Sequence, residues 1–207
     1  MELPILVIPN KTDARCKKKW RIVVNFRKLN DVTIEDSFPI PVISEILDAL
    51  GKSKYFSTID CASGFLQVSV KLEYQAKTTF STRGHFQYTR MPFGLKGAPA
   101  TFQRLMTTIL SGIQRTECLH YLNDVVIFGK NLQVHNERLR EVFGRMRKYN
   151  IKLQPDKCEF LRKEVSYLGH IIGQTGVRLD EKNITALKEY PEPRTTRELK
   201  GLLGLAG

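Results

Sequence analysis

Short apolar segments separated by polar turns run through this 207-residue chain. One of them, CLHYLNDVVIF (residues 118–128), has two apolar arms around a small polar centre, a pattern that predicts a β-hairpin. We expect the polar pair Asn123-Asp124 to form its turn. The residues expected on the two arms are Leu119, Tyr121, Val125, Ile127 and Phe128.

Several other segments have the alternation or the β-branched composition that is typical of strands. They are WRIVVN (20–25), YFSTID (55–60) and LQVSVK (66–71), the last of which alternates as a half-exposed strand does. TTFST and HFQYT lie on either side of Arg83-Gly84 and predict a second hairpin. SYLGHIIGQTGVRL (166–179) predicts a further hairpin.

Helices are predicted where apolar residues recur every three or four positions or where capping signals occur. VISEILDAL (42–50) is a short helix that Gly51 can end, and Pro99 opens a longer one. A third spans about residues 131–149, and two more follow near the C-terminus, the last with the capping box TTRE (195–198). Strand runs followed by single helices predict an α+β fold. The expected buried stripes are Phe102, Leu105, Met106, Ile109, Leu110 and Ile113 after Pro99, and Leu139, Val142, Phe143 and Met146 in the third helix.

The chain is strongly basic, with 33 Lys and Arg against 21 Asp and Glu, a net charge of +12 and a pI near 9.6. This excess favours a polyanionic partner, most simply nucleic acid, and a basic protein without such a partner is the alternative. Basic residues concentrate in residues 1–30 and 131–163. Charges on a helix such as 131–149 usually form a solvated face, and we prefer that explanation for the second cluster. The first lies on an expected exposed turn, where it can neutralise phosphates.

Composition also argues against other classes of protein. No apolar run is long enough to span a membrane and the N-terminus has no secretory pattern, which predicts an intracellular protein of the cytoplasm or nucleus without a membrane partner. The cysteines Cys16, Cys61, Cys118 and Cys158 are far apart and form no CxxC motif. We expect them to be free thiols in a reducing compartment, not zinc ligands.

Two acidic residues have positions suited to a metal site. Asp60 ends the predicted strand YFSTID, and Asp124 lies at the tip of the predicted hairpin. Carboxylates on such rigid supports, brought together by the fold, can hold divalent cations for phosphoryl chemistry. The neighbouring Asn123 offers an oxygen but no negative charge.

Six segments, taken together and in this order, resemble the reverse transcriptase domain of gypsy-like LTR retrotransposons. The resemblance runs along essentially the whole chain and implies an α+β right-hand polymerase with palm, fingers and a truncated thumb. It implies one domain over 1–207, with fingers at 1–36 and 71–98, palm at 37–70 and 99–173, and the start of a thumb or connection at 174–207. The segments are WRIVVNFRKLN, FPIPVISEILDALGKSKYFSTIDCASGFLQV, KTTFSTRGHFQYTRMPFGLKGAPATFQRLM, YLNDVVIFGK, KLQPDKCEFLRKEVSYLGHII and ELKGLLGLAG.

The resemblance also implies the residues of an active site. Asp60, Asp124 and Lys157 would be catalytic, with Lys157 protonating the leaving pyrophosphate. Asp60, Asp124, Asn123 (Asp in the family) and the backbone of Cys61 would hold two Mg²⁺ ions, for which Mn²⁺ can substitute. The expected nucleotide-binding residues are Lys11, Arg21, Cys61, Ala62, Phe65, Phe93 and Gly94, and the expected primer grip is Leu168, Gly169 and His170.

The function implied is that of an RNA-directed DNA polymerase domain of a retrotransposon pol polyprotein. A DNA primer end would attack a dNTP on an RNA or DNA template, and Phe65 would act as a steric gate against a 2′-hydroxyl. The missing negative charge at Asn123 predicts impaired activity. A loss of about 4 kcal/mol of transition-state stabilisation from this ligand would slow the reaction roughly a thousandfold. The alternative is a catalytically dead remnant or a co-opted nucleic-acid-binding module with the same fold. The pattern does not define an oligomeric state.

Overall fold

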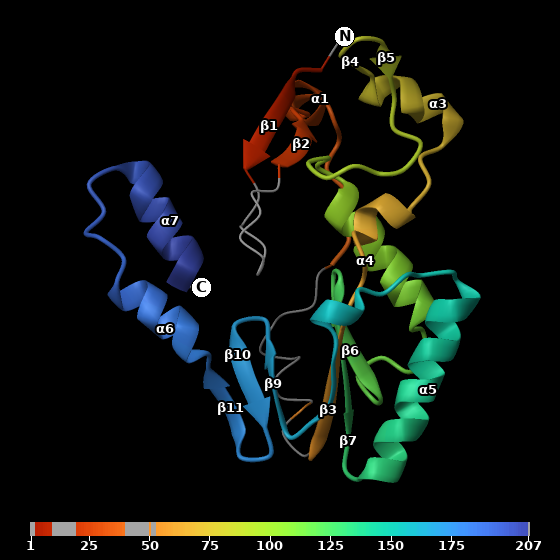
Figure 1. Ribbon diagram of the computed structural model, residues 1–207, viewed down its shortest axis with the longest axis vertical. Coiled ribbons are helices and arrows are strands. Elements are labelled where there is room, and N and C mark those ends of the chain that lie inside the picture. The colour runs from red at the N-terminus through yellow and green to blue at the C-terminus, as the bar shows by residue number, and fades with distance from the viewer. Residues whose placement is uncertain (1–2, 10–19, 40–49, 51–52, 207) are drawn as a thin grey trace.

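The computed structural model describes residues 3–9, 20–39, 50 and 53–206 of the chain. A four-stranded sheet lies at one end of the molecule, and a group of short strands and helices lies at the other. Helix α4 (Ala98–Ile109) runs between the two ends (Figure 1). The α+β class expected from the sequence is confirmed.

The central sheet has the strand order β6-β7-β3-β8, and each neighbouring pair is antiparallel. Strand β3 (Tyr55–Asp60) lies between β7 (Asp124–Gly129) and β8 (Glu159–Arg162). Strand β6 (Cys118–Tyr121) completes the predicted hairpin with β7. YFSTID is therefore an inner strand, which explains its β-branched and aromatic composition.

Alternate side chains of β7 enter two separate hydrophobic cores. Val125 and Ile127 pack with α4 and α5 (Leu132–Lys148), whereas Val126 and Phe128 pack against a second, smaller sheet. All four side chains are buried. Because both faces of this strand are covered, its sequence is a continuous apolar run and does not alternate.

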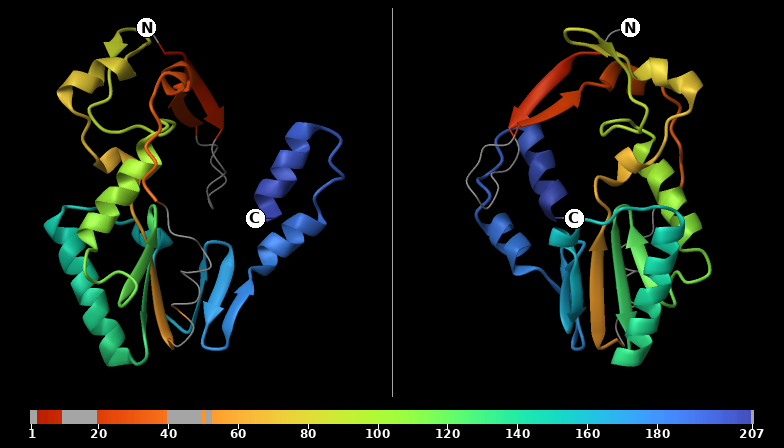
Figure 2. Two further views of the ribbon diagram at one scale, coloured as in Figure 1. Left: turned by 180° about the vertical axis from the view of Figure 1, so that it is seen from behind. Right: turned by 45° about the vertical axis from the view of Figure 1, so that its right-hand side comes forward.

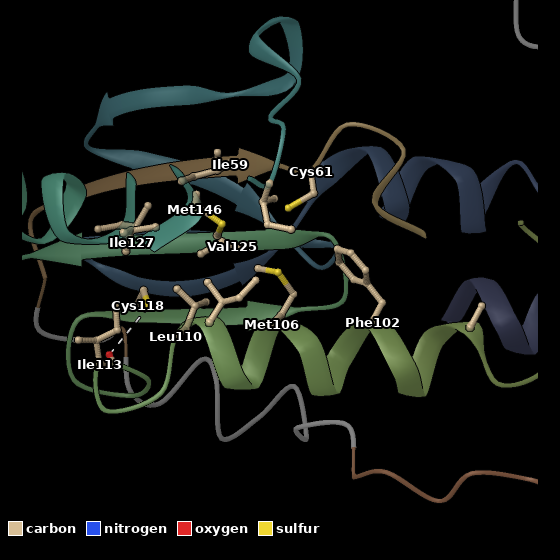
Figure 3. Packing of buried hydrophobic residues seen from close by; sticks show 14 of the residues in the cluster. Ile59, Cys61, Phe102, Met106, Leu110, Ile113, Cys118, Val125, Ile127 and Met146 are labelled. Carbon is tan, nitrogen blue, oxygen red and sulfur yellow. Dashed lines mark hydrogen bonds between the residues drawn. The ribbon is translucent and has the colours of Figure 1, made fainter. Parts of the chain in front are cut away.

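The two long helices cover one face of the central sheet. Helix α4 has Pro99 in its first turn, where a missing N–H costs no helical hydrogen bond. Its predicted stripe is confirmed, and Figure 3 shows Phe102, Met106 and Leu110 pointing toward the strands. Helix α5 starts after Asn131, whose Oδ1 accepts from the Val134 N–H at 2.9 Å. Each fully buried side chain of this core contributes about 1.5–3 kcal/mol.

The second sheet packs on the opposite face of the central sheet (Figure 2). It consists of β9 (Glu164–Tyr167), β10 (His170–Gly173) and β11 (Gly176–Leu179) in the order β11-β10-β9. The prediction of a single hairpin over 166–179 is therefore wrong. The segment holds two tight turns only a few residues apart, and the first strand begins before the apolar pattern does.

The distal end of the molecule has its own small core of Leu3, Val24 and Phe26, with Phe80 and Tyr88 packed against it. Its elements are β1 (Ile5–Pro9), β2 (Trp20–Val24), α1 (Arg27–Asp31), α3 (Leu72–Gln75), η2 (Ala76–Thr78), β4 (Phe80–Ser81) and β5 (His85–Phe86). The hairpin predicted around Arg83-Gly84 is confirmed in a shorter form, as the pair β4 and β5.

The prediction of a strand over LQVSVK is wrong. A 3-10 turn, η1 (Gly64–Gln67), occupies its start, and only Ser69 forms an isolated bridge, to Arg90. Val68 and Val70 pack on the core beneath α4, which explains the alternation. Pairing is limited to this one bridge, where the Met91 N–H donates to the Val68 carbonyl at 2.9 Å and the Val70 N–H to the Thr89 carbonyl at 3.0 Å.

Helices α6 (Glu181–Lys188) and α7 (Thr196–Ala206) follow β11 and extend away from the central sheet (Figure 1). The capping box is confirmed, since the Glu198 N–H donates to Thr195 Oγ1 and the Thr195 N–H to Glu198 Oε2, each at 3.2 Å. Most of the helix predicted at 42–50 lies outside the described residues. None of the described helices is both long and apolar enough to cross a membrane. Cys61, Cys118 and Cys158 are free, as expected.

Candidate active site

Asp60 and Asp124 lie directly opposite each other in the register of β3 and β7. Opposed residues of antiparallel strands have Cβ atoms about 4.5–5.5 Å apart. Two carboxylates from distant parts of the sequence therefore share one end of the sheet. The prediction that the strand end and the hairpin bring these acids onto adjacent strands is confirmed.

Lys157 partly balances this negative charge. Its Nζ lies 3.2 Å from Asp60 Oδ2. The lysine ends a single 3-10 turn, η3 (Pro155–Lys157), and the residue before that turn, Gln154, donates its N–H to the Asp60 carbonyl at 2.9 Å. The lysine side chain is 56% exposed, so the ion pair contributes little to stability and the ammonium group stays accessible.

The environment of the pair disfavours a second negative charge. The pKa of Asp124 is raised above its ordinary value, first because the protein partly removes its carboxyl group from water and second because Asp60 is negative; Lys157 opposes the shift. A cation bound between the two carboxylates would relieve this repulsion. The electrostatics of the site therefore favour a positively charged ligand.

A cavity of about 210 Å³ joins this pair to the second sheet. Its lining includes Asp60, Asp124, Lys157, Tyr167 and Leu168. Leu168 therefore lies close to the carboxylates. It forms the turn between β9 and β10 with Gly169, at φ values of 49° and 78°, and His170 follows as the first residue of β10.

The hairpin turn is formed by Leu122 and Asn123, because Tyr121 pairs with Asp124 across the strands. The expectation that Asn123 and Asp124 form the turn is therefore wrong by one residue, and Asp124 is the first residue of β7. Leu122 has φ +51°, a left-handed conformation that costs a non-glycine residue about 1–2 kcal/mol. The register that places each side chain of β7 in its own core outweighs this local cost.

Three elements fix this turn through its backbone. The Leu122 N–H donates to Oε1 of Gln103 on α4 at 2.8 Å, and Gln103 is 1% exposed. The Asn123 carbonyl accepts from the Cys61 N–H at 3.0 Å, and the Asp124 carbonyl accepts from the Tyr167 hydroxyl at 3.2 Å. The turn is thus held by α4, by the end of β3 and by β9.

The side chain of Asn123 packs against Gly64. A β-carbon built on Gly64 would collide with Asn123 Oδ1 and would come within 2.7 Å of Phe102 Cζ. Asn123 Oδ1 is buried and has no hydrogen-bond partner among the residues that the structure describes. A buried oxygen without a protein partner is a group that calls for an explanation, and a missing ligand is one such explanation.

The backbone after Asp60 is largely engaged within the protein. The Cys61 N–H binds the Asn123 carbonyl, and the Ala62 N–H donates to the Lys152 carbonyl at 2.9 Å. Gln67 Nε2 donates to the Ala62 carbonyl at 2.7 Å. Burial and then the charges of Asp60 and Asp124 raise the pKa of the Cys61 thiol to about 12, so its sulfur stays protonated and is a poor metal ligand.

These donors fit a divalent cation with oxygen ligands. Two carboxylates and one unpartnered amide oxygen are hard ligands of the kind that Mg²⁺ and Mn²⁺ prefer. Among the described residues, no three His, Cys, Asp or Glu side chains come together as a metal-binding group. Further ligands would therefore have to come from backbone, water or substrate, as is common for Mg²⁺.

Three aromatic rings form a group next to η1. Phe65 lies 5.3 Å from Phe93 and 5.7 Å from Phe102 between ring centroids. Gly94, the residue after Phe93, has φ +93°, and its carbonyl accepts a hydrogen bond from Asn30. Three of the expected nucleotide-binding residues, Phe65, Phe93 and Gly94, are therefore brought together by the fold.

Two expected nucleotide-binding residues are not placed in the same way. Lys11, like Lys17, Lys18 and Lys19 of the N-terminal basic cluster, lies outside the described residues. Arg21 lies on β2, where the backbone alone is described.

Gln103, Gly64 and Tyr167 are not among the site residues expected from the sequence. The sequence holds one indication that Gln103 is buried: it is a polar residue on a helix, directly beside the buried stripe position Phe102. A Gly at 64 and a Tyr at 167 have no comparable signal, since their roles depend on contacts with a distant turn.

The sequence profile described as "Reverse transcriptase (RNA-dependent DNA polymerase)" matches residues 8–172. The chain therefore belongs to the reverse transcriptase family, and its fold is that of the palm and fingers of a right-hand polymerase.

Within the family it is a domain of the gypsy-like retrotransposon Pol type. It is 47% identical over 205 residues to the retrovirus-related Pol polyprotein from transposon 297 of Drosophila melanogaster, covering 99% of this chain and 19% of that protein. It is 37% identical to the corresponding polyprotein from transposon gypsy, covering 98% of this chain and 20% of that protein. The chain thus spans about a fifth of these relatives.

Solved structures with the same fold include the foamy viral protease-reverse transcriptase. In complex with double-stranded DNA it superimposes with a TM-score of 0.86 at 30% identity, over 99% of this chain and 35% of that chain. In complex with an RNA/DNA hybrid the TM-score is 0.83 at 29% identity, over 99% of this chain and 27% of that chain. Reverse transcriptases generally use divalent metal ions, which agrees with the donor set described above.

Proposed function

We propose that this chain catalyses RNA-directed DNA synthesis, extending a DNA primer on an RNA or DNA template with dNTPs. The observation that carries the proposal is the in-register pair of Asp60 and Asp124 with Lys157 beside it. Membership of the reverse transcriptase family and the nucleic-acid complexes of the foamy viral relatives support it.

Asp60, Asp124 and the oxygen of Asn123 would hold two Mg²⁺ ions, or Mn²⁺ in their place. When bound, the ions lower the pKa of the primer 3′-hydroxyl and stabilise the charge that develops on the phosphates. Lys157 Nζ, held at Asp60, donates a proton to the leaving pyrophosphate. Leu168, with Gly169 and His170, positions the primer end beside the carboxylates.

The incoming nucleotide lies over η1 and the loop before α4 in this proposal. Phe65 lies under its sugar and excludes a 2′-hydroxyl, and Phe93 and Gly94 complete the pocket with the backbone of Cys61 and Ala62. Lys11 and Arg21 contact its phosphates. The fingers comprise 1–36 and 71–98, the palm 37–70 and 99–173, and the thumb begins at 174–207.

Asn123 limits the rate in this mechanism. Within the described part of the chain its oxygen has no hydrogen-bond partner, so an oxygen donor would be retained at this position but the negative charge is missing. Two dications and a triphosphate gain much of their stabilisation from anionic ligands. The unmodified chain is therefore a slow polymerase.

Primer extension tests the proposal. The chain should incorporate dNTPs slowly on an RNA template, Asn123→Asp should incorporate them about a thousandfold faster, and Asn123→Asp combined with Asp60→Asn should be inactive. If neither the chain nor Asn123→Asp extends a primer, the polymerase proposal fails and the non-catalytic alternative holds. If the two extend at equal rates, Asn123 is not a metal ligand.

A further inference from the structure

Asn30, near the end of α1, uses its whole carboxamide to bind one distant loop. Its Nδ2 donates to the Gly94 carbonyl at 2.8 Å, and its Oδ1 accepts from the Lys96 N–H at 2.9 Å. The loop is 64 to 66 residues further along the chain. Two hydrogen bonds of opposite direction from one planar group fix both the position and the orientation of this loop relative to α1.

The loop depends on such contacts because it has no regular structure of its own. Between Met91 and Gly97 the chain forms neither helix nor strand. Gly94 has φ +93°, and a β-carbon placed there would lie 3.5 Å from the Phe26 ring. Phe26 precedes α1 and is 2% exposed. The start of α1 therefore supports the loop by packing, and Asn30 fixes it by hydrogen bonds.

This loop carries Phe93, whose ring packs at 50° against Phe65 with centroids 5.3 Å apart. On another side Phe65 makes an edge contact with Phe102, which is fully buried in α4. One neighbour of Phe65 is thus fixed by the core, whereas the other is carried by the loop. The contact between Asn30 and Gly94 can therefore act on Phe65 through the position of Phe93.

We propose that Asn30 is a positioning residue for nucleotide selection: by clamping the loop of Phe93, it holds Phe65 at the angle that excludes the 2′-hydroxyl of a ribonucleotide. This inference rests on the proposed polymerase function. Asn30 would not touch the nucleotide. Its effect would appear in the discrimination between dNTP and rNTP, which a purely structural residue would not change.

Three variants separate this role from general stability. Asn30→Leu keeps the size of the side chain and removes both hydrogen bonds. Asn30→Asp keeps the acceptor for Lys96 and turns an oxygen toward the Gly94 carbonyl. Asn25→Ala is the control, because Asn25 Oδ1 accepts from the Arg27 N–H at 3.1 Å at the start of the same helix and is not bonded to the loop.

The measurement is the ratio of dissociation constants for a dNTP and its rNTP, with the chain on a primer–template whose primer ends in a dideoxynucleotide. Nucleotide incorporation is then blocked, and the preference for dNTP over rNTP is measured from binding alone. Selectivity is the dissociation constant of the rNTP divided by that of the dNTP, and Asn30→Leu should lower this ratio about tenfold, since two hydrogen bonds together contribute roughly 1.4 kcal/mol. The selectivity ratio of Asn30→Asp should lie between those of Asn30→Leu and the wild type, and the ratio of Asn25→Ala should stay within about twofold of the wild-type ratio.

Hydrogen exchange at the Lys96 amide gives a second readout. Exchange should be faster in Asn30→Leu than in Asn30→Asp, which keeps the acceptor. Equal dNTP/rNTP ratios in wild type and Asn30→Leu, or an equal loss in Asn25→Ala, would overturn the inference while the polymerase function stands. A wild-type chain that binds neither nucleotide would overturn the proposed function and the role of Asn30 with it.

Discussion

The carboxamide of Asn123 lies against the α-carbon of Gly64, where it leaves no room for a β-carbon. The contact joins the hairpin turn to the start of η1, directly after the strand that ends in Asp60. The contact restricts the side chain of residue 123, whose oxygen is buried and has no hydrogen-bond partner in the described ranges.

Gly64→Ala tests this contact. The added methyl group must displace Asn123 or the Phe102 ring, so we expect the free energy of unfolding to fall by about 1–3 kcal/mol and primer extension to decrease. Gly144→Ala is the matched control, because no atom of the described residues lies within 4 Å of a β-carbon there and alanine favours the helix. A Gly64→Ala protein as stable and active as Gly144→Ala would contradict the packing.

Asn123→Asp should change how the protein responds to metal. A third carboxylate beside Asp60 and Asp124 should lower the melting temperature in metal-free buffer through repulsion. Mg²⁺ at about 100 times its Kd should then stabilise this variant by about 2.7 kcal/mol. Asn150→Asp adds the same charge in the turn after α5 and should show no such response to Mg²⁺ in thermal melts. Equal Mg²⁺ shifts in the two variants would argue against a metal site at residue 123.

Gln103→Leu should destabilise the turn. The Leu122 N–H would lose its acceptor inside the protein, and a buried unsatisfied donor costs about 1–3 kcal/mol. Gln133→Leu provides the comparison, because Gln133 is exposed on α5 and its loss should change stability by no more than about 0.5 kcal/mol. Urea unfolding measures both. Identical midpoints would show that Gln103 does not hold the turn.

Acid should destabilise the domain through His120. Burial lowers the pKa of His120 to about 4, and the pKa of His135 is also lowered by burial. Because the folded pKa of His120 lies below its unfolded value near 6.5, stability is complete above that value and is lost as the pH falls toward 4. The loss should reach about 3 kcal/mol. His120→Gln should flatten the slope of unfolding free energy between pH 7 and 4, as measured by urea unfolding at a series of pH values.

Nucleic-acid binding should depend steeply on salt, since a chain of net charge +12 releases counterions from the phosphates it neutralises. Replacing Lys17, Lys18 and Lys19 with alanine should reduce the slope of log K against log salt by up to about 0.9 for each phosphate that is no longer neutralised. Fluorescence anisotropy with a labelled primer–template measures this slope. Binding that is equal at low and at high salt would refute an electrostatic interface.

Local sequence patterns predicted the elements whose burial follows directly from spacing. The apolar stripe of α4, the long helix after residue 131, the capping box at Thr195 and the run around Val125 each arise from residues close in the chain. Such interactions satisfy nearby backbone groups or one continuous face, so they need no knowledge of distant partners.

The failures have one common cause, which is competition from distant contacts. Val68 and Val70 alternate as a strand does, yet their segment pairs with residues 89–91 through one isolated bridge only, and a 3-10 turn occupies its start. The turn at Leu122 adopts a conformation that leucine disfavours, because Gln103, Cys61 and Tyr167 bind its backbone from three other elements.

The sequence by itself determined the candidate residues of the site: an acid at the end of a strand, an acid at a hairpin and an asparagine between its arms. Only the tertiary structure decided that Asp60 and Asp124 are in register, that Lys157 is bound to Asp60, and that Asn123 is packed on Gly64. The physical reason is that side-chain type and spacing encode local periodicity. The pairing of strands and the contacts between them are set by how two cores pack at once on the faces of β7.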